Sequence, residues 1–159
     1  MKKLIIVLSI FFLIGCKSKN IVASPAETEV FKVERLTLSE ISESQKSKAY
    51  ELGKRVLMTC NTSKFKPFTL NEATPSVIKN TTEERLTKTC TRFRQFYGTF
   101  IDLQLVEAYR NNFDKSTVFR YKGLYSKKVA NKELRVTMNS ENKVSSIKSL
   151  DWVNSFPLN

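Results

Sequence analysis

Three carboxylates on predicted strands come closest to an acid–base pair in this chain: Asp102, Glu107 and Glu133. Two carboxyl groups that face one cavity could perform general acid–base catalysis. Asp102 and Glu107 are five positions apart, so a regular strand directs them to opposite faces unless a β-bulge shifts the alternation. We therefore expect solvent-facing charges beside Arg or Lys on neighbouring strands, and no catalytic residue.

Histidine is absent from the sequence, and its absence excludes several kinds of chemistry. Without imidazole there is no Ser-His-Asp or Cys-His nucleophile, no histidine general base and few of the ligand sets that bind zinc. The four glycines form no phosphate-binding loop. We expect a non-enzymatic protein without metal or cofactor, and a hydrolase or isomerase acting in a cavity of the fold is the least favoured alternative.

Aromatic side chains gather on the predicted strands and could line a pocket. The candidates for a ligand pocket are Tyr109, Tyr121, Tyr125 and Arg120. Their hydroxyl and guanidinium groups could orient a small ligand, although aromatic residues on strands more often belong to the core. Alternation places Tyr121 and Tyr125 on one face of their strand and Arg120 on the other, so pocket and core both remain open interpretations.

Cys60 and Cys90 lie on the apolar faces of two predicted helices, 30 positions apart. Outside the cytoplasm such a pair can form a disulfide, worth about 3–4 kcal/mol in the chain-entropy account. The alternative is a pair of reduced cysteines that pack as small hydrophobic residues. Catalytic thiol chemistry is not expected, because no histidine can activate either sulfur.

The chain is strongly basic, with a formal net charge of +12 at pH 7. Arg85, Lys88 and Arg92 form a basic stripe on a predicted helix, opposite its apolar face. Such a stripe is usually a solvated helix face, and the alternative is a docking surface for an anionic membrane or an acidic polymer. Nucleic acid is not an expected partner, because no recognition motif is present.

Two helices are predicted from apolar residues at helical spacing. One begins at Ser42 and ends near residue 62, and the second runs between Thr81 and Gly98. Each starts with the spacing of a capping box, and glycine is a common helix terminator. Pro75 can open a short helical turn between them.

After Gly98 the hydrophobic period changes to two, which predicts strands. The four expected strands cover residues 101–110, 117–125, 134–138 and 144–150. Gly123 indicates a bulge or bend, and Val144 and Ile147 are out of phase, which indicates a bulge near residues 145–146. The expected fold class is α+β, with N-terminal helices packed on a curved four-stranded antiparallel sheet.

The N-terminus carries a targeting signal. Two lysines precede an apolar run at residues 4–14, which is shorter than the roughly 20 residues needed to span a membrane. The signal ends in Leu13-Ile14-Gly15-Cys16, and these four residues resemble the lipobox of bacterial lipoproteins. The resemblance implies cleavage before Cys16 and fatty acylation of that cysteine. It places the protein on the cell membrane or outer membrane with its domain facing the periplasm.

The expected domain organisation follows from this signal. Residues 1–15 form the signal peptide, residues 16–41 a lipidated tether and residues 42–159 a single α+β domain. Two or three acyl chains on one cysteine would hold the protein firmly, because a single chain binds a membrane only marginally.

The order of elements, with Tyr97-Gly98, Tyr109-Arg110 and the runs 117–121 and 132–138, resembles the nuclear-transport-factor-like (cystatin-like cone) superfamily. The resemblance covers roughly residues 42–150 and implies a curved sheet wrapped on a long helix, with a pocket between them. Such domains include enzymes, small-molecule binders and scaffolds, so the fold does not choose the function. We expect a membrane-anchored binding or scaffold domain. A small-ligand carrier that uses the cavity is the alternative, and the oligomeric state stays open.

Overall fold

A computed structural model describes residues 33–156 of the chain. The signal peptide and Cys16 lie outside these residues, so the lipid anchor remains a prediction. In chain order, the elements are β1 (Val33–Leu36), the 3-10 turn η1 (Leu38–Glu40), α1 (Glu43–Thr62), α2 (Pro75–Asn80), α3 (Glu83–Tyr97), β2 (Phe100–Asn111), β3 (Thr117–Tyr125), β4 (Lys132–Met138) and β5 (Val144–Asp151).

The sheet has five antiparallel strands in the order β1-β2-β3-β4-β5, so the α+β class is confirmed and the expected count of four strands is wrong. The missed strand β1 pairs with the end of β2, from Leu36 opposite Ala108 to Val33 opposite Asn111. Four residues at a sheet edge are too few to show a clear period-two pattern. Residues 33–41, expected in the tether, therefore carry β1 and η1.

The strand registers test the expected bulges. The predicted bulge near residues 145–146 is confirmed, because Thr137 pairs with Ser146 while the next residue, Met138, pairs with Val144. No bulge is found at Gly123, since Gly123 keeps regular pairing with both neighbouring strands, and the alternative of a bend stays a prediction. A side chain there would lie 2.8 Å from the ring of Tyr125, so the glycine makes room for that ring.

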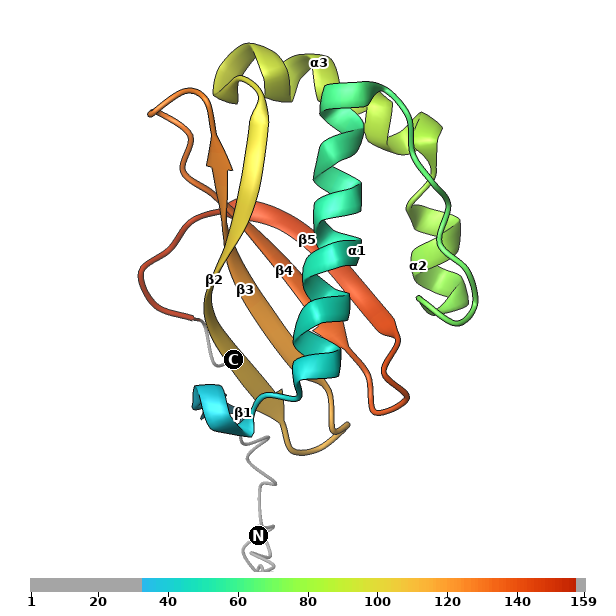
Figure 1. The fold of residues 1–159 in the computed structure, drawn as a ribbon, viewed down its shortest axis with the longest axis vertical. Coiled ribbons are helices and arrows are strands. Elements are labelled where there is room, and N and C mark those ends of the chain that lie inside the picture. Colours follow the sequence, from blue (N-terminus) through green and yellow to red (C-terminus); the bar gives the residue numbers. More distant parts are fainter. Residues whose placement is uncertain (1–32, 157–159) are drawn as a thin grey trace, which may run out of the picture.

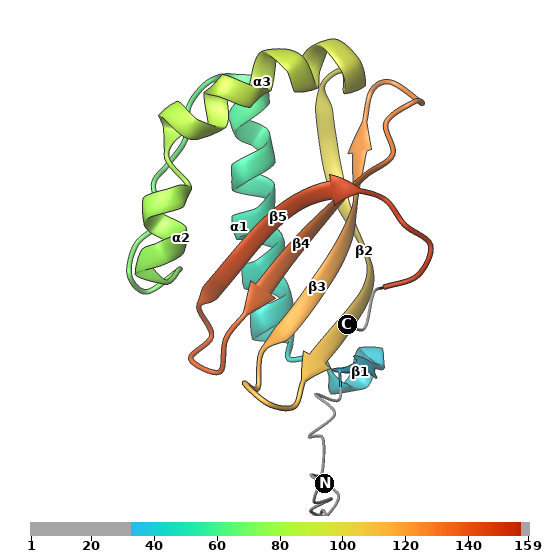
Figure 2. The same cartoon turned by 180° about the vertical axis from the view of Figure 1, so that it is seen from behind.

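Helix α1 lies diagonally across one face of the sheet, and α3 crosses the end of the molecule (Figure 1). Gly53 allows close approach, because a Cβ on Gly53 would lie 2.8 Å from a methyl carbon of Leu134. The core between α1 and the sheet includes Leu52, Val56, Leu103, Phe119, Tyr121, Leu134, Val136 and Met138. No α-helix of the described chain crosses the opposite face of the sheet (Figure 2).

Local signals set the limits of the long helices. The Ser42 hydroxyl accepts a hydrogen bond from the Gln45 amide at the start of α1, which is half of the expected capping box. The Gln45 side chain instead donates to the Asn139 carbonyl. Helix α3 is capped by Thr82, one residue after the predicted Thr81, and ends at Gly98, whose φ of 80° favours glycine.

A disulfide ties the long helices together. Cys60, near the end of α1, is bonded to Cys90 in the middle of α3. The predicted disulfide is confirmed, and it holds α3 beside the C-terminal half of α1.

Candidate functional site

A partly open groove runs along α3, with a cavity volume of about 520 Å³. Its lining residues are Lys88, Thr89, Arg92, Phe93, Phe96, Tyr97, Lys132 and Asp151. Most come from one face of α3, where positions three and four apart are neighbours. The remaining two come from the start of β4 and the end of β5, which pair with each other in the sheet.

Cations and aromatic rings lie against one another in this groove. The Lys132 ammonium is 5.5 Å from the centre of the Phe93 ring and 5.3 Å from that of Tyr97. The Arg92 guanidinium is 5.9 Å from the Phe96 ring centre. These distances are in the range of cation–π attraction, which holds the cations at the groove while leaving their N–H donors available.

Acidic neighbours offset part of this positive charge. Lys88 pairs with Glu84 at 2.7 Å on the exposed helix surface, and Lys132 pairs with Asp151 at 2.7 Å. Both side chains of the Lys88–Glu84 pair are exposed, so that pair is weak and can open. The Lys132 side chain is 12% exposed, so it is held more firmly beside the exposed Asp151. No ion pair is found for Arg92 within residues 33–156, so its positive charge is the one most available to a partner.

The structure divides the predicted basic stripe. Lys88 and Arg92 line the groove, but Arg85 turns away and donates to the Asn80 side chain at the end of α2. The stripe therefore supplies two of the groove's cations, and the third, Lys132, comes from β4. The arrangement can hold an anionic group beside an apolar or aromatic one.

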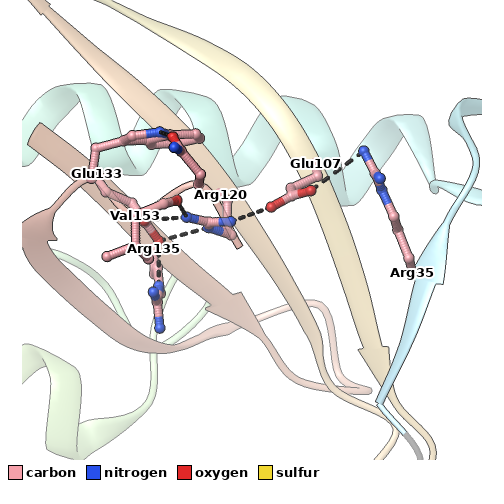
Figure 3. Close-up of polar contacts among 8 residues, drawn as sticks. Arg35, Glu107, Arg120, Glu133, Arg135 and Val153 are labelled. Atoms are coloured by element: carbon pink, nitrogen blue, oxygen red, sulfur yellow. Dashed lines mark hydrogen bonds and ion pairs between the residues drawn. The ribbon is translucent and has the colours of Figure 1, made fainter. Parts of the chain in front are cut away.

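A second charged cluster lies on the sheet face opposite α1 (Figure 3). Arg120 of β3 donates to both oxygens of the Glu133 carboxylate, to Glu107 and to the carbonyl oxygen of Val153. Arg135 also donates to Glu133, and Arg35 reaches Glu107 at 3.3 Å.

The C-terminal segment covers this cluster. The Arg120 guanidinium is 4.6 Å from the Trp152 ring centre and 5.5 Å from that of Phe156, and its side chain is 0% exposed. Phe156 stacks on Tyr109 with ring centres 4.2 Å apart. Arg120 therefore has carboxylate and carbonyl partners and an aromatic cover, which together leave no open face for a ligand.

The electrostatics of this cluster favour charged, paired groups. Burial acts to raise the pKa of Glu133, but hydrogen bonds from Arg120 and Arg135 outweigh burial and hold that pKa below its usual value. The hydrogen bond from Arg120 to Glu133 in turn raises the pKa of the arginine. A carboxylate held ionised in this way is a poor general acid at neutral pH.

The three strand carboxylates thus have separate partners. Asp102 accepts hydrogen bonds from Tyr50 of α1 and pairs with Lys54, and these contacts, chiefly the one from Tyr50, lower its pKa. Glu107 and Glu133 share Arg120 on the other side of the sheet. The expectation of Arg or Lys partners on neighbouring strands is confirmed for these two, but their expected exposure to solvent is wrong, because the C-terminal segment shields them.

The four candidates for a ligand pocket do not meet. Tyr121 is buried in the core beneath α1, and burial raises its pKa. Tyr125 packs against Phe100, and burial raises its pKa to about 12. Tyr109 and Arg120 lie on the opposite face of the sheet under Phe156.

Several residues of the groove were not singled out from the sequence. Phe96 follows Lys88 and Arg92 at four-residue spacing on one helix face, a signal that was present in the sequence. Lys132 and Asp151 carried no such signal, because only the pairing of β4 with β5 brings them together beside α3.

The chain matches no protein-family model, no curated protein and no solved structure. Among residues 33–156, no helix combines the length and apolar character of a membrane span. The same residues contain no group of three or more Cys, Asp or Glu side chains placed to hold a metal ion.

Proposed function

We propose that this protein is a lipid-anchored, non-enzymatic binding domain of the bacterial cell envelope. The lipid on Cys16 holds it at a membrane, and the groove along α3 binds an anionic partner. The observation that carries the proposal is that Lys88, Arg92 and Lys132 line one groove, with Arg92 over the exposed Phe96 ring and Lys132 over the half-buried Tyr97 ring.

The position of the groove supports this role. Helix α3 lies at one end of the domain and β1, where the described chain begins, lies at the other (Figure 1). A tether that joins the domain at β1 leaves the α3 end free to meet a partner.

The long α1 lying across an antiparallel sheet also supports the cone-like curvature that the superfamily resemblance implies.

The alternatives receive less support. A carrier that uses a cavity between sheet and helices needs space beneath α1, but Gly53 and Leu134 are in close contact there and Tyr121 is 1% exposed. An enzyme in the same fold needs an acid–base group that a substrate can reach, whereas the Glu133 side chain is 0% exposed and is bound by Arg120 and Arg135.

Photo-crosslinking in the native host tests the groove. A crosslinking amino acid replaces Thr89 in the groove and, as a matched control, Lys115 in the β2–β3 turn at the opposite end. We expect covalent adducts from position 89 that are absent from position 115. Identical adducts from both positions, or none from position 89, would contradict the proposal.

Intact mass spectrometry tests the anchor. Protein purified from its host membrane should begin at Cys16 and carry the added mass of fatty acyl chains. A chain that begins at Met1, or one without acyl mass, would rule out the lipid anchor.

A further inference from the structure

Exposed apolar side chains accompany the cations at the α3 end of the molecule. Phe96 of α3 is 53% exposed and Val129, in the β3–β4 loop, is 72% exposed. The loop is fixed to the end of α3, because the Lys127 amide donates to the Tyr97 carbonyl and its ammonium group donates to the Gln95 carbonyl. A helix and a loop therefore present apolar side chains at the same end of the domain.

The cations at this end are spread over three elements. We define the α3-end surface as Lys88, Arg92 and Phe96 of α3, Lys127, Lys128 and Val129 of the loop, and Lys132 of β4. The acidic side chains that pair with this surface are Glu84 and Asp151, both largely exposed. The surface is therefore net positive, with apolar side chains among its cations.

We infer that the α3-end surface docks on the phosphate-bearing headgroups of an anionic lipid membrane; this inference rests on the proposed function and names the partner. An array of phosphates matches cations that are distributed over a helix, a strand and a loop. Long basic side chains place their charges at headgroups while aromatic and aliphatic groups enter the acyl boundary. The anchor on Cys16 and the α3-end surface then give the protein two separate membrane contacts.

An acidic polypeptide fits the surface less well. Arginine pairs with carboxylates and phosphates alike, so the cations alone do not separate the two partners. The exposed apolar Phe96 and Val129 side chains favour a partner with a hydrocarbon layer over an acidic, polar chain.

Vesicle binding by the mature chain, residues 16–159 with Cys16→Ser to remove the acyl chains, tests this inference. Co-sedimentation is measured with vesicles of phosphatidylcholine alone and of phosphatidylcholine mixed with phosphatidylglycerol. We expect binding only to the mixture, and weaker binding at higher salt, because salt screens exposed charges. Arg92→Glu should weaken binding by about fivefold or more, since each cation near an anionic membrane contributes about 1 kcal/mol.

Two further variants separate the contributions. Phe96→Ala should weaken binding while leaving its salt dependence unchanged, because it removes apolar area and no charge. Lys115→Glu makes the same charge change at the opposite end of the domain and should bind like the parent protein. Near-ultraviolet circular dichroism and an assay for free thiols confirm that each variant is folded and disulfide-bonded.

The outcomes distinguish the inference from the function on which it rests. Equal binding to both kinds of vesicle, or equal losses in Arg92→Glu and Lys115→Glu, would overturn the lipid inference. Binding of a poly-glutamate peptide without binding of phosphatidylglycerol vesicles would overturn it too, and would assign the surface to an acidic polypeptide. Crosslinking from position 89 to a protein would then still support the proposed function, whereas no crosslinking would remove both.

Discussion

At the α3 groove the Lys88 side chain is 69% exposed, whereas Arg120 on the sheet face is fully enclosed. Both regions combine basic residues with aromatic rings, but only Arg120 has two carboxylates within hydrogen-bonding reach. The C-terminal segment adds a carbonyl oxygen and two rings to Arg120. Ion pairing with carboxylates and burial under aromatic rings therefore decide whether a basic side chain stabilises the fold or remains available to a partner.

Removing Arg120 should produce the largest effect. Arg120→Ala removes the enclosed cation that Glu107 and Glu133 share, and leaves them only the more exposed Arg35 and Arg135 as partners. Breaking a buried ion pair on one side costs about 3–5 kcal/mol. We expect a loss of this size in the free energy of unfolding, measured by urea denaturation. A loss below about 1 kcal/mol, the range of exposed pairs, would show that the cluster is solvated.

Breaking the disulfide should have the next largest effect. Replacing Cys60 and Cys90 together by alanine removes a crosslink across 30 residues and should cost about 3–4 kcal/mol of unfolding free energy. The same urea titration measures it, with the parent protein under reducing conditions as the control. Because the bond holds α3 beside α1, we also expect the double variant to show a larger acceleration of amide exchange in α3 than in β3, relative to the parent protein. Equal acceleration in both elements would contradict a local role.

Acid should weaken the domain through the ion pair between Arg55 of α1 and Glu72. Hydrogen bonds from Arg55 lower the pKa of Glu72 from 4.5 to about 2. A lowered carboxyl pKa contributes stability above the unfolded value, and that stability is lost as pH falls from about 4.5 towards 2. Glu72→Gln should therefore remove about 1–3 kcal/mol at neutral pH and flatten stability over this window. If the free energy of unfolding fell with pH as steeply in Glu72→Gln as in the parent protein, this assignment would be wrong.

The smallest effect on stability is expected at the groove. Arg92 is exposed and has no ion-pair partner in the described chain, so Arg92→Glu should change the free energy of unfolding by less than about 0.5 kcal/mol. Thermal unfolding of Arg92→Glu, Arg120→Ala and the parent protein under the same conditions compares the two positions. A destabilisation of the same size at both positions would mean that Arg92 serves the fold and would weaken the binding proposal.

Local patterns in the sequence predicted much of the fold. Helix α1 and the bulge at residues 145–146 follow from spacing and phase. For Cys60 and Cys90 the same spacing left two outcomes open, and the structure shows the disulfide. Strand β1 did not, because its four residues become a strand only by pairing with the far end of β2. Spacing within one element is visible in a sequence, whereas pairing between distant segments is not.

The candidate site shows the same division. Lys88 and Arg92 were found because they share a helix face, but Lys132 reaches the groove through the sheet register. Alternation also placed Arg120 on the strand face opposite Tyr121, but its burial depends on Trp152 and Phe156. These aromatic residues follow the last strand, where no periodic pattern indicates their position.

Amide hydrogen exchange of the mature Cys16→Ser chain, with and without phosphatidylglycerol vesicles, compares the two charged regions in one measurement. The account predicts new protection confined to α3 and residues 126–132, with exchange in β3 and residues 152–156 unchanged. Protection on β3 or the C-terminal segment, with none on α3, would contradict the assignment of binding to the groove and of structure to the Arg120 cluster.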